Sequence, residues 1–235
     1  MTYVLVHGGG FAGSCWDELC PLLDEPVLAV DLPGRGRNPG DLSSLTVADF
    51  VASVAAEIVR NDLTEVTLVG HSLAGLTLPG VVEAVSDRLR RVVFVSCSVP
   101  PHGVALADVL EGFSPSAAAI AQQLGDDLVD GSGLLHPDLA RVMFCNDMDD
   151  EQTASTLGRR VPEALGVLSE PTDLTGMRRS TPRTYVRLTH DAIVSLETQG
   201  QMIENLGGAE LAHLDAGHMA MISRPDDLAA LLNHL

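Results

Sequence analysis

The sequence has 235 residues, a length that fits one α/β domain with an insertion and leaves no room for a second independent enzyme domain. Acidic residues number 32 and basic residues 14, so the formal net charge is −18 at pH 7, which disfavours nucleic acid and anionic membrane surfaces as partners. All basic residues are arginine, and this excludes lysine Schiff-base chemistry, Ser-Lys dyads and P-loops.

Short apolar runs rich in Val, Leu and Thr alternate with segments of helical periodicity, a pattern typical of a parallel sheet covered by helices on both faces. The predicted strands are Thr2 to Val6, Pro26 to Val30, Glu65 to Val69, Arg91 to Ser96, Arg183 to Thr189 and Glu210 to Leu214. The predicted helices are Trp16 to Leu23, Val47 to Arg60, Leu73 to Val85, Leu196 to Leu206 and Pro225 to Leu232. The sequence therefore predicts an α/β fold with six mostly parallel strands.

Between the fourth and fifth predicted strands, residues 99–182 break this alternation, with many prolines and no convincing strand. A segment of this length is too long for a plain loop in a compact domain, so we expect a mostly helical insertion that forms a lid over the carboxyl edge of the sheet. Residues 1–98 and 183–235 then form the two parts of the core. A helical subdomain that only buries core is the alternative.

The amino-terminal segment and the cysteines indicate where the protein is found. Met1 to Gly8 has no basic region and runs directly into a strand, so we expect no signal peptide, and no apolar run is long enough for a membrane span. The cysteines have no C-x-x-C spacing, which predicts reduced thiols in a cytoplasmic protein. They are Cys15, Cys20, Cys97 and Cys145.

The sharpest local signal is Gly70-His71-Ser72-Leu73-Ala74, where a strand ends in a glycine turn and enters a helix. A serine on such a strained turn projects its hydroxyl above the sheet at the amino end of the helix, where a nucleophile is placed. The pattern approximates G-x-S-x-G, with alanine in the last position. An ordinary Gly-Ser turn would have the same sequence pattern, so the assignment of Ser72 as a nucleophile depends on whether a base and an acid are found elsewhere in the chain.

A serine hydroxyl needs a base within hydrogen-bond reach, and the base needs an acid that orients it. After a nucleophile of this type, the acid and then the histidine follow later in the chain, each just past a strand. Asp191 follows the fifth predicted strand and His218 follows the sixth. Asp173 and Asp215 are the other carboxylates that could be argued, but neither follows a strand at the right stage.

The seven other histidines fit the role of base less well. We interpret His7 and His71 as stabilising glycine turns, and His213 as a buried core residue within a strand. The rest precede the proposed acid or lie in the insertion or at the tail: His190, His102, His136 and His234.

A glycine turn after the first predicted strand, His7-Gly8-Gly9-Gly10, can supply backbone N–H groups to a developing negative oxygen. We expect Gly9 as one donor, with Gly10 as the alternative, and the N–H of Leu73 as the other. A phosphate-binding loop is the competing interpretation, but no G-x-G-x-x-G opens a helix here and no acid stands at the ribose-binding spacing.

Several segments, taken in their order along the chain, make the sequence recognisable. Over essentially its whole length it resembles an α/β-hydrolase fold protein, and within that superfamily it resembles the plant methyl esterase and hydroxynitrile lyase group and its bacterial esterase relatives. The matching segments are His7-Gly8 with Trp16, Asp31-Leu32-Pro33-Gly34-Arg35-Gly36, Gly70-His71-Ser72-Leu73, Phe144-Cys145-Asn146-Asp147, Thr189-His190-Asp191 and Gly217-His218-Met219-Ala220-Met221.

By this resemblance Ser72 is the nucleophile, His218 the general base and then acid, and Asp191 the orienting carboxylate. Gly9 and Leu73 form the oxyanion hole, and no metal or cofactor takes part. The resemblance also favours a homodimer over a monomer.

The resemblance separates two chemistries within the group. Cyanohydrin cleavage by the lyases depends on a lysine beside the catalytic histidine and on a hydroxyl residue after the first-strand histidine, and Met219 and Gly8 occupy these positions here. Ester hydrolysis is therefore implied. The chain departs from the group at Ala74, in a lid that is poor in aromatic residues, and in the turn after the acid, which lacks the usual proline-flanked bulk.

We therefore expect a serine carboxylesterase whose lid covers an apolar cleft, with Phe11, Phe144 and Met219 as wall residues and a small or medium hydrophobic ester as substrate. Two alternatives stay open. One is a non-hydrolytic enzyme with the same fold, such as a lyase or a natural-product tailoring or cyclising enzyme. The other is a ligand sensor that keeps the hydrolase shape.

Overall fold

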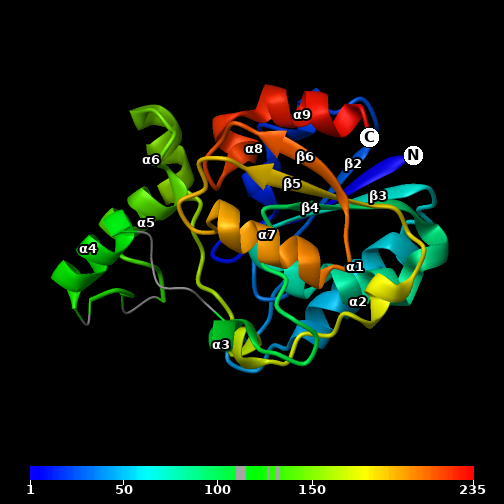
Figure 1. Ribbon diagram of the computed structural model, residues 1–235, viewed down its shortest axis with the longest axis horizontal. Coiled ribbons are helices and arrows are strands. Elements are labelled where there is room, and N and C mark those ends of the chain that lie inside the picture. The colour runs from blue at the N-terminus through cyan, green and yellow to red at the C-terminus, as the bar shows by residue number, and fades with distance from the viewer. Residues whose placement is uncertain (110–114, 126, 131–132) are drawn as a thin grey trace.

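A single parallel sheet of six strands organises the structure, a computed structural model that describes residues 1–109, 115–125, 127–130 and 133–235 (Figure 1). The strand order is β2-β1-β3-β4-β5-β6, and every neighbouring pair is parallel. This confirms the predicted α/β fold. The strands are β1 Thr2–Val6, β2 Val27–Val30, β3 Val66–His71, β4 Leu89–Val95, β5 Arg183–Leu188 and β6 Glu210–Leu214.

Side chains of the central strands alternate between two hydrophobic cores, because successive residues of a strand point to opposite faces. Val4 of β1 belongs to the core under α1 (Val47–Arg60), α2 (Leu78–Val85) and α7 (Leu196–Asn205). Leu5 belongs to the core on the other face, under α8 (Ala220–Ser223) and α9 (Pro225–Asn233). Both faces of the central strands are therefore buried, which is why these strands are continuous apolar runs in the sequence.

Two of the predicted helices differ from the structure because of proline. The helix expected over Trp16 to Leu23 is wrong: two short 3-10 segments, η1 (Gly13–Trp16) and η2 (Cys20–Leu22), take its place. Pro21 lies in the first turn of η2 and has no N–H with which to continue an α-helix.

The helix expected over Leu73 to Val85 also divides, into the 3-10 segment η3 (Ser72–Leu76) and α2. Pro79 occupies the first turn of α2, where its missing N–H costs no hydrogen bond, so α2 begins there.

His213 does not lie in the core, contrary to expectation. It belongs to β6, and its side chain is exposed. The reason is that β6 is an edge strand, and among its residues only Leu214 is buried. A period-two pattern in the sequence does not distinguish such an edge strand from a central one.

The insertion, residues 99–182, carries helices and short 3-10 segments, and its described residues form only isolated β-bridges. The helices α4 to α6 lie beyond the carboxyl ends of the strands (Figure 1), whereas η6 returns to the core and packs on α2. None of the helices in the described residues has the length and apolar character needed to cross a bilayer. The elements of the insertion are α3 Leu106–Val109, α4 Pro115–Leu124, α5 Pro137–Phe144, α6 Asp150–Gly158, η5 Leu165–Ser169 and η6 Thr175–Arg178.

Candidate active site

The turn between β3 and η3 holds Ser72 in a left-handed backbone conformation, with φ of +52°. Non-glycine residues adopt this conformation rarely, and it is kept here by close packing around the turn. A Cβ atom on Gly70 would lie 2.6 Å from Leu78 Cδ1, and one on Gly75 would lie 2.1 Å from the carbonyl oxygen of Ser98. The backbone of Ser98 thus approaches the chain most closely at Gly75 and not at Ala74. The methyl group of Ala74, in the last position of the G-x-S-x-G pattern, is therefore accommodated.

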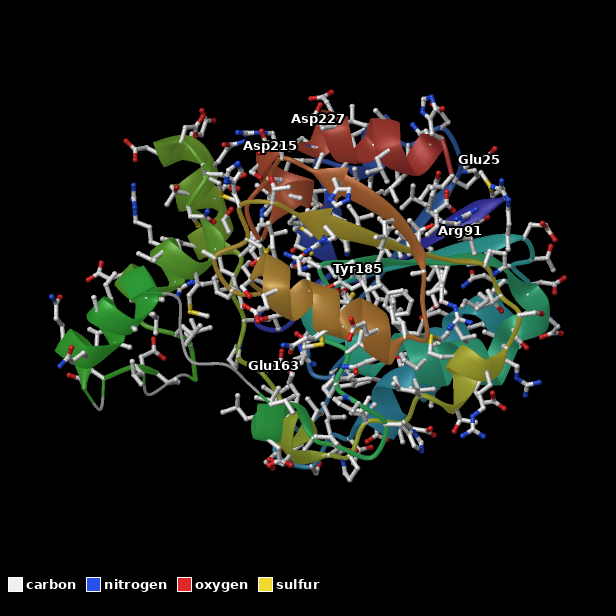
Figure 2. The ribbon with its side chains drawn as sticks, viewed as in Figure 1. Glu25, Arg91, Glu163, Tyr185, Asp215 and Asp227 are labelled. Atoms are coloured by element: carbon white, nitrogen blue, oxygen red, sulfur yellow. The ribbon has the colours of Figure 1, made fainter. Side chains whose placement is uncertain are left out.

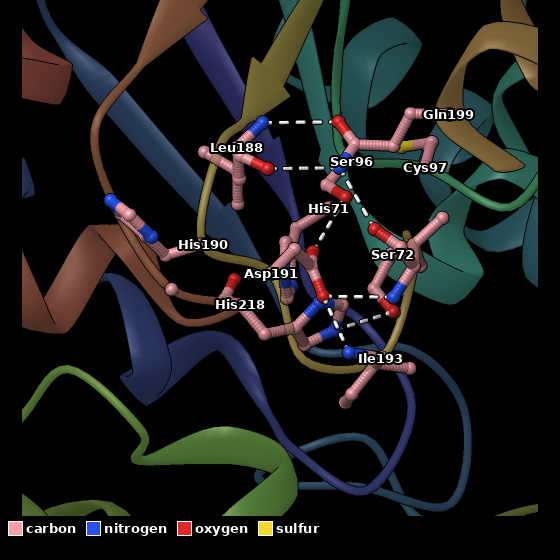
Figure 3. A network of polar contacts seen from close by, with 12 residues as sticks. His71, Ser72, Ser96, Cys97, Leu188, His190, Asp191, Ile193, Gln199 and His218 are labelled. Carbon is pink, nitrogen blue, oxygen red and sulfur yellow. Dashed lines mark hydrogen bonds and ion pairs between the residues drawn. The ribbon is translucent and has the colours of Figure 1, made fainter. Parts of the chain in front are cut away.

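Three side chains from separate parts of the chain meet at this turn (Figure 3). His218 Nε2 lies 2.9 Å from Ser72 Oγ, and His218 Nδ1 lies 2.7 Å from Asp191 Oδ2. The His218 and Asp191 side chains are 1% and 0% exposed. With Nδ1–H donated to the carboxylate, Nε2 is left to accept the serine proton, which is the arrangement a base requires.

The carboxyl group of Asp191 accepts three further hydrogen bonds. Ser96 Oγ–H donates to Oδ2 at 2.7 Å, and the N–H groups of Ile193 and Val194 donate to Oδ1 at 2.8 Å each. Burial raises the pKa of Asp191, but the neighbouring His218 and the hydrogen bonds outweigh burial and hold the pKa below its usual value. The carboxyl is therefore an anion at neutral pH.

Ser96 was not identified in the sequence analysis. It directly follows β4, and its position after a central strand was the one signal available, since carboxyl ends of parallel strands share one edge of the sheet.

Gln199, fully buried on α7, fixes the acid loop (residues 189–195) to the end of β5. Its Oε1 accepts from Leu188 N–H at 3.0 Å, and its Nε2 donates to the carbonyl oxygens of Leu188 and Val194 at 2.9 and 2.8 Å. These bonds satisfy backbone groups that have no strand partner where β5 ends, and they hold the acid loop that carries Asp191.

Two neighbouring residues after α5 bind the backbone next to Asp191 and next to His218. Asn146 Nδ2 donates to the carbonyl oxygen of His190 at 2.8 Å, and Asp147 Oδ2 accepts from Gly217 N–H at 2.7 Å. Ser223 Oγ–H also donates to Asp147 Oδ2, at 2.8 Å. The insertion therefore anchors the acid loop and the histidine loop (residues 215–219) together.

His71 and His7 are both buried and both bind backbone groups. His71 Nε2–H donates to the carbonyl oxygen of His218 at 2.8 Å, and its pKa is lowered well below the usual value by burial and by the nearby His218 ring. His7 Nδ1–H donates to Gly8 O at 2.8 Å and Nε2 accepts from Leu32 N–H at 3.1 Å, while burial lowers the pKa of His7 to about 4. Both rings are thus neutral supports of the turns at the site.

The glycine turn (residues 7–10) lies against Ser72: a Cβ atom on Gly8 would be 2.9 Å from Ser72 Cβ. Gly10 N–H donates to Glu163 Oε2 at 2.8 Å, so this alternative donor is engaged. The N–H of Gly9 has no acceptor among the described residues. Leu73 lies in the first turn of η3, where N–H groups have no partner within the helix.

A mostly apolar cavity of about 260 Å³ opens above Ser72 and is bounded by the glycine turn on one side and by the insertion on the other. Phe144 lines it, as expected. Phe11 and Met219 do not, because Phe11 packs edge-on behind Phe144 with ring centroids 5.2 Å apart and Met219 is enclosed in the hydrophobic core. The other residues from the insertion include Leu106, Leu134, Leu135, Met143, Leu165 and Leu168.

The alternative carboxylates lie elsewhere. Asp215 is at the surface (Figure 2), where its side chain is 84% exposed and pairs with His190. Asp173 is also exposed and accepts from Thr175. Within the described part of the chain, no group of three His, Cys, Asp or Glu side chains is arranged to hold a metal ion. The four cysteines are unpaired.

Comparisons with known proteins find relatives that match nearly the whole chain. Polyneuridine aldehyde esterase of Rauvolfia serpentina is 29% identical, covering 98% of this chain and 93% of the relative. Methylesterase 9 of Arabidopsis thaliana is 27% identical, covering 96% and 94%. The solved structure of an extracellular α/β-hydrolase from a Paenibacillus species is 26% identical, with a TM-score of 0.82 over 99% and 97% of the two chains. The sequence profile of the Alpha/beta hydrolase family matches residues 3–231, and the chain belongs to that family.

Proposed function

We propose that the protein is a serine carboxylesterase that uses Ser72, His218 and Asp191 as its catalytic triad. The observation that carries the proposal is the unbroken line of hydrogen bonds from Asp191 Oδ2 through His218 to Ser72 Oγ, with distances of 2.7 and 2.9 Å. The names of its relatives support it, because polyneuridine aldehyde esterase, methylesterase 9 and a pyrethroid hydrolase are among them.

In the first half of the reaction, Ser72 Oγ attacks the ester carbonyl carbon while His218 Nε2 takes the hydroxyl proton. The imidazolium that forms is stabilised by the Asp191 anion beside Nδ1. The negative carbonyl oxygen of the tetrahedral intermediate accepts from the N–H groups of Gly9 and Leu73. The intermediate collapses when His218 delivers its proton to the leaving alkoxide, and an acyl-serine and a free alcohol result.

In the second half, water takes the place of the alcohol. His218 Nε2 removes one proton from the water as its oxygen attacks the acyl carbon, and the same two N–H groups stabilise the second tetrahedral intermediate. Return of the proton to Ser72 Oγ releases the carboxylic acid and restores the enzyme. No cofactor enters this sequence.

The cavity indicates a small or medium hydrophobic ester. Its volume of about 260 Å³ and its wall of leucine, valine, methionine and phenylalanine side chains favour an apolar acyl or alcohol group. Cyanohydrin cleavage is not favoured, because position 219 is methionine and the chain has no lysine.

Hydrolysis of 4-nitrophenyl esters with acyl chains from acetate to laurate, by the wild type and by Ser72→Ala, tests the proposal. We expect turnover of the shorter esters by the wild type, loss of at least 10³-fold in kcat on Ser72→Ala, and no change on the control Ser14→Ala at an exposed serine. Equal rates for the wild type and Ser72→Ala, or no turnover of any ester, would contradict it.

A further inference from the structure

A buried ion pair lies directly behind the glycine turn. Arg35 comes from the turn after β2, and Glu163 (labelled in Figure 2) comes from the chain between α6 and η5. Their side chains form a salt bridge and are 1% and 13% exposed. Arg35 also donates from Nη1 to Pro33 O at 2.9 Å, and its guanidinium lies over the ring of Phe50, 4.9 Å from the centroid.

The Glu163 carboxylate is the direct partner of the glycine turn. Its Oε2 accepts from Gly10 N–H at 2.8 Å, and its Oε1 accepts from Ala164 N–H at 2.7 Å and faces Arg35. The carbonyl oxygen of Gly10 in turn accepts from Val161 N–H at 2.8 Å. Both backbone polar groups of Gly10 are therefore held by residues 161–163.

This carboxylate also lies close to where negative charge develops in the proposed reaction. A Cβ atom on Gly9 would lie 3.1 Å from Glu163 Oε2 and 3.0 Å from Leu73 Cδ2, so Gly9 is enclosed between these two side chains. The salt bridge and the two oxyanion donors line the same small cavity. An unpaired carboxylate here would repel the carbonyl oxygen of the tetrahedral intermediate, because charges interact strongly where water is excluded.

We propose that Arg35 and Glu163 are positioning residues for the oxyanion hole. Glu163 fixes Gly10 so that the N–H of the preceding Gly9 stays free for the substrate oxygen. Arg35 cancels the carboxylate charge that this fixation brings close to the intermediate. The inference rests on the proposed esterase function and extends it from the triad to the electrostatics of the oxyanion hole.

The test compares Arg35→Met, Glu163→Gln and the double variant by steady-state kinetics on 4-nitrophenyl butyrate between pH 6 and 8. We expect Arg35→Met to lower kcat at least tenfold at pH 8 with KM changed less than threefold. The deficit should shrink toward pH 6, because losing the cation raises the pKa of the buried Glu163 carboxyl and protonation then removes the repelling charge. A merely structural loss would not follow this pH dependence.

The double variant isolates the charge effect from the loss of the arginine. In the Glu163→Gln background, Arg35→Met should cost less than threefold in kcat, because no carboxylate is left unpaired. Glu163→Gln alone should lower kcat at least threefold, because Arg35 and Ala164 retain the amide oxygen and its NH₂ group then faces Gly10 N–H. The matched control is Arg179→Met, which breaks the exposed Arg179–Glu83 pair and should leave kcat unchanged.

Removing one partner of a buried pair can prevent folding, so each variant is first checked for a cooperative thermal transition. If Arg35→Met does not fold, the kcat values of Glu163→Gln and of the double variant test the proposal without it. The proposal is wrong if Glu163→Gln retains full kcat, if the Arg35→Met deficit is independent of pH, or if the effects fall on KM.

Failure of the proposed function is distinguishable from failure of this inference. A wild type that hydrolyses no ester contradicts the esterase proposal. The rate at which a fluorophosphonate labels Ser72 in the same variants still measures the ion pair, because the phosphonyl oxygen gains negative charge at the same N–H groups. Equal labelling rates in the wild type, Arg35→Met and Glu163→Gln would overturn the inference.

Discussion

Replacing Asp191 by asparagine should trap His218 in the wrong tautomer. In the wild type, Oδ1 accepts from the N–H groups of Ile193 and Val194, and Oδ2 accepts from Ser96 and His218. An asparagine oxygen retained by the two backbone donors turns the NH₂ group toward His218. Nδ1 must then accept, so the ring proton moves to Nε2, which can no longer take the Ser72 proton.

The size of the effect follows from the alternative orientation of the amide. Turning the oxygen toward His218 restores the tautomer but leaves two buried N–H groups facing an NH₂ group, at about 1–3 kcal/mol each. The total of about 2–6 kcal/mol corresponds to about 30-fold to 3 × 10⁴-fold in rate. Loss of the carboxylate charge acts in the same direction, so we expect a fall in kcat of about 10³-fold.

The assay is kcat for 4-nitrophenyl butyrate at pH 8, with Asp215→Asn and Asp173→Asn as controls. Both control residues are exposed carboxylates that pair with other histidines, Asp215 with His190 and Asp173 with His102, and their variants should match the wild type. An Asp191→Asn enzyme within fivefold of the wild type, or an equal loss in Asp215→Asn, would refute the reasoning.

Three further predictions concern the groups around the triad. Gln199→Leu leaves three buried backbone groups without a partner and should lower the free energy of unfolding by about 3 kcal/mol in urea titrations. The control Gln201→Leu, on the exposed side of the same helix, should change the free energy of unfolding by less than about 0.5 kcal/mol. Asp147→Leu removes the acceptor of Gly217 N–H and should lower kcat about tenfold, which corresponds to about 1.4 kcal/mol. Asp147→Asn keeps an acceptor, and its kcat should stay closer to that of the wild type. Equal losses of kcat in both variants would exclude a role of this hydrogen bond in holding the histidine loop. The third prediction concerns pH, because the pKa of Asp191 is lower in the folded state than its unfolded value of about 3.8. The stability that the Asp191 carboxylate contributes is therefore present above pH 3.8 and is lost as the pH falls through the lower folded pKa. In denaturant titrations, the unfolding free energies of the wild type and Asp191→Asn should converge below about pH 4.

The sheet could be predicted from the sequence because its central strands are buried on both faces and therefore form continuous apolar runs. The helices were harder, since Pro21 and Pro79 change the hydrogen bonding locally without removing the apolar periodicity. His213 shows the same limit at the sheet edge, where an alternating pattern persists but no layer covers the strand.

For the site, the positions of Ser72, Asp191 and His218 follow from chain order and from strand ends, which are visible in the sequence. The residues that hold their loops are not visible in this way. Asn146 and Glu163 bind backbone groups from distant parts of the chain, and Gln199 binds those of the strand end and loop that precede its helix. A backbone group leaves no signature of its own in the sequence.

The two attachments that flank α6 divide the insertion into parts with different tasks. Residues 146–147 bind the loops of the triad and residues 161–163 bind the glycine turn. The described residues between 106 and 143 supply much of the cavity wall and none of these attachments. Substrate preference can consequently diverge by exchange of residues 106–143 while the reaction centre is conserved. Grafting that stretch from a relative is the natural route to redesigning this enzyme's selectivity.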